Sequence, residues 1–372
     1  SHSMNTASWV DRLMAEGEDR GRTEGLRRIA YFCSYVPEEI LSVPGLYGCR
    51  MRAPNTVSTE TADSYLGLFN CSYTRAVLET ILERESGWMD GFVFTAGCDH
   101  LRRLNDNQVH VASPPFCTIL GLPYKKHDDA RVWYTEELSL LRASLEKHFG
   151  LCVGDEELRG AIEACNENRR LLSSLNELRK GENPPVTGED MQRIVIASFS
   201  LPKSVVNPAL ADWIEEVGTA GLDRDFRARV LLMGSQLDDP AYVRVIEDAG
   251  ALVVADGHCF GSLQYEHAVG SNPDPLRAIA DRYLEKTPCP RMFDAYPERY
   301  RRIVEMARDF GVQGIIIQTM KFCDTWGIEG NVFLNNLREE GLPVLRLERE
   351  YALGGVGQMK TRIQAFLEAM GC

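Results

Sequence analysis

Cys33, Cys98, Cys259 and Cys323 each follow closely on a short apolar run that is typical of a β-strand. In parallel α/β sheets, ligands bind beyond the carboxyl ends of the strands, where loops from several strands converge. Thiolates are soft ligands that hold zinc, copper or iron–sulfur clusters. Helix starts beside such thiols would lower their pKa and stabilise an anionic cluster. We therefore expect these four thiols to line one metal site between two facing α/β halves.

The number and spacing of the cysteines narrow the kind of metal. The chain has 11 cysteines, and a reducing compartment disfavours structural disulfides, so metal binding or redox chemistry is the leading explanation. Paired Cys-x₂₋₄-Cys knuckles typical of structural zinc are absent from the sequence, as is two-cluster ferredoxin spacing. Widely separated single cysteines instead favour an iron–sulfur cluster bridged between two domains.

Composition sets looser bounds on the function. The chain has 372 residues with 44% hydrophobic content, enough for two domains with real cores. A net charge of −13 argues against a nucleic-acid partner. The sequence has no apolar run long enough to span a membrane and no secretory pattern, so we expect a cytoplasmic protein. Ser1, His2 and Ser3 before Met4 resemble a tag remnant.

Strand-like and helix-like segments alternate along most of the chain. A helix is expected to start at Pro37, because Glu38 and Glu39 follow it near the positive end of the helix dipole. Expected strands cover 28–33, 91–97, 229–235, 251–256, 314–318 and 342–347, and other expected helices cover 134–148, 156–180, 238–248, 330–340 and 358–370. The predicted regions are an N-terminal helical segment at 4–27, a first α/β domain at 28–150, a helical linker region at 151–221 and a second α/β domain at 222–372.

The two predicted α/β domains follow one plan. The strand at 28–33 and the strand at 229–235 are each followed by a proline and an acidic helix start, and the strands at 91–97 and 314–318 each lead to a Cys-Asp pair. We therefore predict an α/β fold with two similar Rossmann- or flavodoxin-like parallel-sheet domains, a helical segment between them and the cluster in the cleft.

Several motifs give the chain a specific resemblance to a known family. The sequence resembles the 2-hydroxyacyl-CoA dehydratase and benzoyl-CoA reductase family of iron–sulfur proteins over nearly its whole length. The motifs that carry the resemblance are Cys33-Ser-Tyr-Val-Pro-Glu-Glu-Ile, Asn70-Cys71-Ser-Tyr with Leu78-Glu79, Gly97-Cys98-Asp-His-Leu-Arg-Arg, Lys321-Phe-Cys323-Asp and Gly357-Gln-Met-Lys-Thr-Arg-Ile-Gln-Ala-Phe-Leu-Glu368.

The resemblance implies a cluster, its ligands and a partner. Family members hold an oxygen-sensitive cluster through three cysteines, which correspond in motif to Cys71, Cys98 and Cys323, and receive electrons from an ATP-hydrolysing iron–sulfur activator. Dehydratases and benzoyl-CoA reductases pair two different subunits, whereas the related double-cubane cluster protein is a homodimer. That relative needs about three thiolates for each of two cubanes. The further motif-borne cysteines Cys33, Cys49 and Cys259 bring the count to six.

Three functions are therefore open. The first is a homodimeric reductase in which a double-cubane [8Fe–9S] cluster, charged by the activator, reduces a small molecule. The second is the [4Fe–4S] subunit of a 2-hydroxyacyl-CoA dehydratase or benzoyl-CoA reductase, and the third is a cluster-less scaffold that binds a small ligand. We favour the first because of the six placed thiols.

Other residues have simpler interpretations. His100 and His258 lie next to proposed ligands and are weak candidates for proton donors, although a place on a solvated helix face fits them equally well. The chain has no P-loop, so ATP is expected to act on the partner. Packing or surface positions are expected for the remaining cysteines, which are Cys117, Cys152, Cys165, Cys289 and Cys372.

Overall fold

The fold contains two separate parallel β-sheets of four strands each in a computed structural model, which describes residues 5–84, 87–218 and 220–372. The possible tag remnant at residues 1–3 lies outside these ranges. The first sheet consists of β1 (Arg27–Tyr31), β2 (Leu46–Arg50), β3 (Gly91–Thr95) and β4 (Cys117–Leu120). The second consists of β5 (Ala228–Gly234), β6 (Ala251–Gly257), β7 (Gly314–Met320) and β8 (Val344–Arg349).

The two sheets have the same strand order. The first runs β2-β1-β3-β4 and the second runs β6-β5-β7-β8, and every strand pair is parallel. This is the order of the first four strands of a flavodoxin-like sheet, in which ligands bind at the carboxyl ends next to the point where the order reverses. The predicted α/β class with two similar parallel sheets is confirmed, whereas the predicted domain boundaries remain a prediction.

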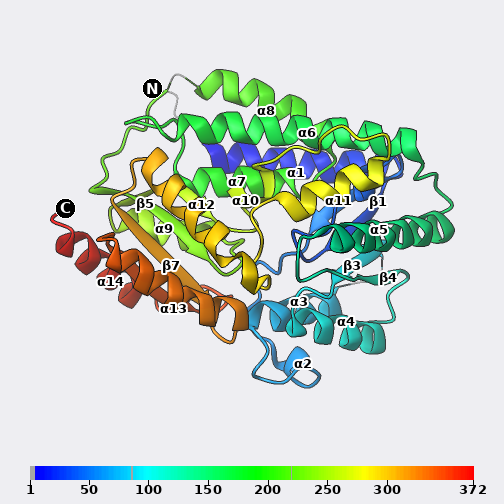
Figure 1. The fold of residues 1–372 in the computed structure, drawn as a ribbon, viewed down its shortest axis with the longest axis horizontal. Coiled ribbons are helices and arrows are strands. Elements are labelled where there is room, and N and C mark those ends of the chain that lie inside the picture. The colour runs from blue at the N-terminus through cyan, green and yellow to red at the C-terminus, as the bar shows by residue number, and fades with distance from the viewer. Residues whose placement is uncertain (1–4, 85–86, 219) are drawn as a thin grey trace.

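Helices cover the sheets and form a layer of their own. In Figure 1 the blue helix α1 runs beside the green helices α6, α7 and α8, on one side of the molecule. Their apolar faces form a shared core with Leu13, Leu175, Ile194 and Trp213. The helices are α1 (Thr6–Thr23), α2 (Glu60–Asp63), α3 (Ser72–Glu83), α4 (Asp99–Ala112), α5 (Asp128–Phe149), α6 (Asp155–Leu178), α7 (Gly188–Ser198), α8 (Lys203–Val217), α9 (Pro240–Asp248), α10 (Ser262–Tyr265), α11 (Pro275–Glu285), α12 (Tyr296–Asp309), α13 (Asp324–Glu339) and α14 (Val356–Ala369). No described helix is both long and apolar enough to cross a membrane.

Helix α11 leaves the second half and packs against the first. Its residues Leu276, Ile279 and Tyr283 share a core with Leu138 and Leu141 of α5. A helix so far along the chain joins this core because its apolar face completes the cover of the first sheet. The loop after α11 therefore approaches the carboxyl end of β1 rather than that of β5.

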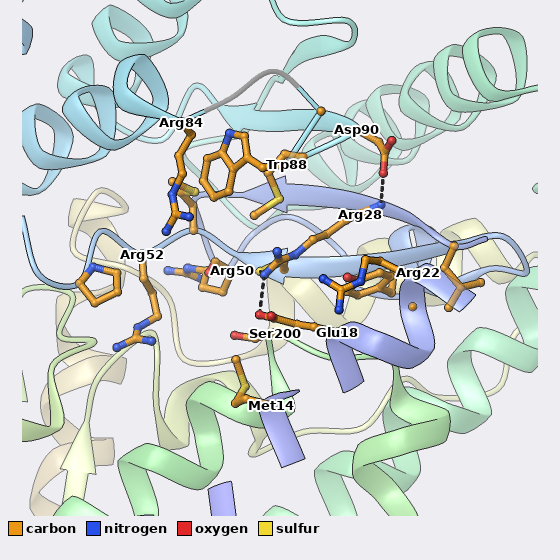
Figure 2. A pocket seen from close by; sticks show the side chains of 18 residues that line it. Met14, Glu18, Arg22, Arg28, Arg50, Arg52, Arg84, Trp88, Asp90 and Ser200 are labelled. Carbon is orange, nitrogen blue, oxygen red and sulfur yellow. Dashed lines mark hydrogen bonds and ion pairs between the residues drawn. The ribbon is translucent and has the colours of Figure 1, made fainter. Parts of the chain in front are cut away.

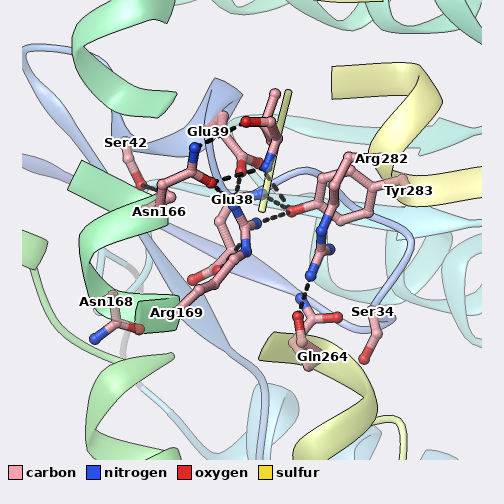
Figure 3. A network of polar contacts seen from close by, with 12 residues as sticks. Ser34, Glu38, Glu39, Ser42, Asn166, Asn168, Arg169, Gln264, Arg282 and Tyr283 are labelled. Carbon is pink, nitrogen blue, oxygen red and sulfur yellow. Dashed lines mark hydrogen bonds and ion pairs between the residues drawn. The ribbon is translucent and has the colours of Figure 1, made fainter. Parts of the chain in front are cut away.

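The helix expected from Pro37 does not form. The segment makes only a 3₁₀ turn, η1 (Ile40–Ser42), because the two glutamates before it are bound elsewhere. Glu39 makes an ion pair of 2.6 Å with Arg169 Nη1 and accepts a 2.8 Å hydrogen bond from Tyr283 Oη, and Glu38 pairs with Lys203 Nζ at 2.7 Å. Figure 3 shows Arg169 and Tyr283 pointing toward the two glutamates. Burial alone raises the pKa of Glu39, but Arg169 holds it below its ordinary value.

The carboxyl ends of the two sheets face each other across hydrogen bonds. Ser34 after β1 donates to the carbonyl oxygen of Cys259 after β6, at 2.5 Å. The Tyr351 backbone N–H after β8 donates to Ser72 Oγ at 2.7 Å, and Tyr351 Oη accepts from the Ala53 N–H at 2.9 Å. Loops that follow strands of both sheets are thus held together, as the sequence predicts for the edge that carries the cysteines.

Candidate metal centre

Three of the predicted ligands occupy the same local position. Cys71, Cys98 and Cys323 are the N-cap residues of α3, α4 and α13, and none of their side chains caps its own helix. Phe322 has a φ of 66°, a left-handed conformation that is rare for a bulky residue and turns the chain sharply before Cys323. The backbone N–H groups and dipole of a helix N-terminus stabilise negative charge, so these positions favour thiolates.

The three N-cap cysteines lie close together, although α13 is far from α3 and α4 in sequence. The charge of Cys71 interacts with that of Cys323, and Cys98 interacts with both and with Cys33. Burial raises the pKa of Cys71 to about 11 and also raises that of the Cys98 thiol, although the Cys98 residue as a whole is exposed. We name Cys71, Cys98 and Cys323 the N-cap triplet. It opens to solvent at Cys98.

His100 links the three loops of the N-cap triplet. Its Nδ1 accepts a 3.1 Å hydrogen bond from the Cys71 backbone N–H, and its Nε2 lies 3.8 Å from Asp324 Oδ2, directly after Cys323. An accepting Nδ1 places the proton on Nε2, which faces the carboxylate. Burial lowers the pKa of His100 despite the nearby carboxylates, which favours the neutral ring. From α4, which follows Cys98, this ring contacts the loops that carry Cys71 and Cys323.

A second group of thiols adjoins the first at Cys33. Cys259 interacts with Cys33, and Cys289, in the loop after α11, interacts with both. Tyr35 Oη accepts a 3.1 Å hydrogen bond from the Cys289 N–H and fixes this loop. Burial raises the pKa of Cys289 to about 12 and also raises that of Cys259. We name Cys33, Cys259 and Cys289 the inner triplet.

Cys289 packs against the core of the first half, as predicted, but it also lies near Cys33 and Cys259, which the sequence does not indicate because Cys289 follows no strand. Its place in the inner triplet depends on α11 crossing to the first sheet. The flanking residues Pro288 and Pro290 are the only local signal in the sequence, and they indicate a fixed loop without indicating a ligand.

Two buried cations face the inner triplet. The Lys286 ammonium lies 4.1 Å from the Tyr35 ring centroid and interacts with all three thiols of the triplet. The Arg50 guanidinium donates to Ser34 Oγ at 2.8 Å and interacts with Cys259 and Cys33. Among the described residues, neither cation makes an ion pair with a carboxylate. An unpaired buried cation is costly, so this side of the site is suited to receive negative charge.

Cys49 lies apart from both triplets. It sits inside β2, where its Sγ accepts from Arg28 Nη2 at 3.4 Å. Successive side chains in a strand point to opposite faces, and the next residue, Arg50, points toward Cys259. Cys49 therefore faces away from the inner triplet and lines a different pocket, which it shares with Arg28 and Trp88.

His258 lies in the second sheet region, away from solvent. Its Nε2 is 3.3 Å from Gln318 Nε2, and Gln318 also accepts a 2.6 Å hydrogen bond from Arg349 Nε. Burial lowers the pKa of His258 to about 4, so the ring is neutral. Its contacts serve to position β6 and β7 at the site.

The remaining cysteines have separate surroundings. Cys117 Sγ donates to Asn105 Oδ1 at 3.4 Å, Cys165 is buried and Cys152 is exposed. In the described ranges, no three Cys, His, Asp or Glu side chains converge closely enough for a single metal ion. A cluster needs a wider spacing than one ion, since each thiolate binds a different iron. The two triplets therefore fit a cluster better than a mononuclear site.

The whole site lies in a sequence span that matches a known family. Residues 33–370 match the family described as 2-hydroxyglutaryl-CoA dehydratase, D-component. The chain belongs to this family. All cysteines of the N-cap and inner triplets lie within the matched span.

Similar proteins of this family carry related names. The chain is 25% identical to the putative dehydratase subunit YjiM of Escherichia coli, over 94% of this chain and 93% of that protein. It is 23% identical to the (R)-phenyllactyl-CoA dehydratase beta subunit of Clostridium sporogenes, over 93% and 92%. It is also 23% identical to a benzoyl-CoA reductase subunit of Thauera aromatica, over 99% of each chain. These family members are named as subunits of dehydratases and of a reductase.

Proposed function

We propose that the chain is an iron–sulfur reductase of this family that holds a double-cubane [8Fe–9S] cluster. The observation that carries the proposal is the continuous band of six thiols formed by the N-cap and inner triplets. The N-cap triplet would hold one cubane and the inner triplet the other. In this assignment Cys289 replaces Cys49, the ligand expected from the motifs.

The charges around the inner triplet support a second cubane. Cys259 and Cys289 have raised pKa values even beside Arg50 and Lys286, so without metal these thiols stay protonated and leave the cations without a counter-charge. Thiolates bound to iron carry negative charge at neutral pH, because metal binding displaces the protons. A cluster at the inner triplet would therefore neutralise both cations.

The surroundings assign roles to residues of this chain. When bound, the cluster would supply low-potential electrons for reduction of a small molecule. Lys286 and Arg50 would stabilise its charge, and His100 would keep the loops of the N-cap triplet in register. The exposed position of Cys98 would leave this triplet accessible to an ATP-hydrolysing iron–sulfur activator and to the substrate. As in the double-cubane relative, we propose a homodimer.

A second function has support from the names of the relatives. The (R)-phenyllactyl-CoA dehydratase beta subunit and the benzoyl-CoA reductase subunit favour a [4Fe–4S] protein that works with a different partner chain. In that case only the N-cap triplet would bind iron, and the inner triplet would remain as free thiols.

Iron and sulfide counts separate the two functions. The chain, expressed alone and purified without oxygen, is expected to contain about eight irons in the first case and about four in the second. Cys289→Ser should lower the count by about half, whereas Cys49→Ser and the exposed control Cys152→Ser should leave it unchanged. Electron paramagnetic resonance of the reduced protein would show which cluster signal each variant loses.

The iron content of the chain and its variants distinguishes the three candidate functions. About four irons in the unmodified chain would support the dehydratase-type subunit. A loss of iron in Cys49→Ser with none in Cys289→Ser would return Cys49 to the ligand set and remove Cys289. A colourless protein without iron after anaerobic purification would instead favour a cluster-less binding scaffold.

A further inference from the structure

A pocket of about 500 Å³ lies between β1, β2 and the helix α1, and none of the six cysteines of the two triplets lines it. Its volume is within the range of about 300–1,000 Å³ that is typical of small-molecule sites. Figure 2 shows side chains from several elements converging on it, with Arg84 and Trp88 at one end, Arg28 in the middle and Arg22 at the other end. The N-terminal helix, the first sheet, Arg84 and residues 87–90 before β3 together form this pocket.

The charge of the pocket is opposite to that of the protein. The chain as a whole carries a net charge of −13, yet the pocket is lined by Arg22, Arg28, Arg50, Arg52 and Arg84, and its acidic side chains among the described residues are Glu18 and Asp90. Arginine forks bind phosphate in a bidentate manner, and clusters of arginine are typical of sites that recognise it.

The two acidic groups already have partners. Glu18 Oε1 accepts from Arg28 Nη2 at 3.3 Å, and Asp90 Oδ2 accepts a 2.7 Å hydrogen bond from the Arg28 backbone N–H. Among the residues that the structure describes, the Arg52 side chain donates to one acceptor, the carbonyl oxygen of Asp238, at 3.1 and 2.9 Å. The buried Nε of Arg28 has no partner among the described residues. Positively charged donor groups therefore outnumber the negatively charged acceptors among the described residues around this pocket.

One end of the pocket is also suited to a flat ring. The Arg84 guanidinium lies over the Trp88 ring, 5.3 Å from its centroid. Aromatic side chains and guanidinium planes are the surfaces on which nucleobases stack. Met51 and Met89 add apolar wall beside this pair.

We infer that this pocket binds the nucleoside diphosphate group of a ligand, with the diphosphate on the arginines and the base at Arg84 and Trp88. The group could belong to a free nucleotide such as ADP or to the head group of coenzyme A. No residue of either triplet lines the pocket, although Arg50, which faces the inner triplet, is also part of its wall.

Isothermal titration calorimetry of the anaerobically purified full-length chain tests the inference. ADP, coenzyme A and pyrophosphate are titrated separately, and iron is counted in the same sample. We expect saturable binding of ADP or coenzyme A with a Kd below about 1 mM, and weaker binding of pyrophosphate, which lacks the base. Binding of coenzyme A tighter than ADP would assign the pocket to a thioester head group, and the reverse order would assign it to a free nucleotide.

Variants test the residues. Arg84→Gln changes an exposed residue and should weaken binding about tenfold without affecting folding. Arg28→Gln should weaken it at least as much, whereas the control Arg301→Gln, on an exposed position of α12, should leave it unchanged. Absence of saturable binding up to about 5 mM, or equal affinity in both pocket variants, would overturn the inference. Equal affinity for pyrophosphate and ADP would overturn the assignment of the base.

Discussion

The N-cap triplet and the inner triplet present the same donor atoms in two different electrostatic settings. Cys71, Cys98 and Cys323 sit at helix N-termini, whose dipoles stabilise negative charge, although burial raises the pKa of Cys71 and Cys98. The inner triplet is instead surrounded by Tyr35 and the buried cations Lys286 and Arg50. Helix ends are present whether or not metal is bound, whereas unpaired buried cations need an anion. If both triplets bind the proposed clusters, the inner triplet should therefore depend more strongly on its metal.

Removal of the cluster should have the largest effect. Stripping iron with a chelator under anaerobic conditions leaves Lys286 and Arg50 without a counter-charge, and loss of one partner of a buried pair costs about 3–5 kcal/mol. We expect the melting temperature to fall by about 10 °C, measured by anaerobic calorimetry. A change of less than about 2 °C would show that the inner triplet does not depend on a cluster.

The buried carboxyl group of Glu247 gives the stability of the fold around the triplets a pH dependence of its own. Glu247 accepts hydrogen bonds from the Gly188 and Glu189 N–H groups at 2.9 and 3.0 Å, but burial raises its pKa to about 7. A raised carboxyl pKa stabilises the fold at low pH, and this stabilisation is lost as the pH rises through about 7. Glu247→Gln should remove a decline of about 2–3 kcal/mol between pH 5 and 8, measured by urea unfolding.

The exposed Glu163→Gln on α6 provides the matched control for that measurement. If the free energy of unfolding of both variants changes with pH as it does in the unmodified chain, Glu247 is not the group responsible.

Replacement of one cation should affect only one triplet. Lys286→Met removes a positive charge beside the inner triplet. We expect the reduction potential of the proposed cluster there to fall by on the order of 50–100 mV, because the reduced cluster loses a stabilising charge. Redox titration with electron paramagnetic resonance measures this potential. The same substitution should stabilise the metal-free chain, because it removes a buried charge. Lys147→Met, on an exposed position of α5, should change neither quantity. A lower melting temperature of metal-free Lys286→Met would contradict this role.

His100 offers the smallest and most local test. His100→Ala removes the acceptor of the Cys71 N–H and should make iron binding at the N-cap triplet less favourable by about 1 kcal/mol. We expect iron to leave this triplet several times faster in the presence of a chelator, while iron in the inner triplet leaves at an unchanged rate. His100→Asn, which keeps an acceptor, should partly restore retention. Equal acceleration at both triplets would show that His100 acts on the fold as a whole.

Much of the fold follows from local sequence, and the exceptions have physical causes. The apolar runs at 229–235, 251–256 and 314–318 predict β5, β6 and β7 closely, because buried parallel strands read as continuous apolar segments. Strand β2 is interrupted by Gly48, and β4 has only four residues next to two prolines, so neither gives such a signal. The helix expected at Pro37 fails because Arg169 and Lys203 draw its glutamates into a buried network.

The site was predictable where its residues follow strands or, as at Cys71, lie in a family motif. Cys33, Cys98, Cys259 and Cys323 lie at strand ends as expected from sequence. Cys289 joins them through α11, whose packing on α5 is set by contacts between distant segments. The link from His100 to the loops of Cys71 and Cys323 likewise depends on tertiary contacts, so residue spacing alone could not reveal it.

The buried network around Glu38 and Glu39 also bears on the order in which the protein matures. Its hydrogen bonds connect residues up to 245 positions apart, from Glu38 to Tyr283. A ribosome that releases the chain from its N-terminus therefore exposes Cys33, Cys71 and Cys98 well before Cys289 and Cys323 have been synthesised. Neither triplet can be complete at that stage. If the triplets bind the proposed cluster, it can be completed only after Cys323 has been synthesised, and the early thiols depend until then on a reducing environment.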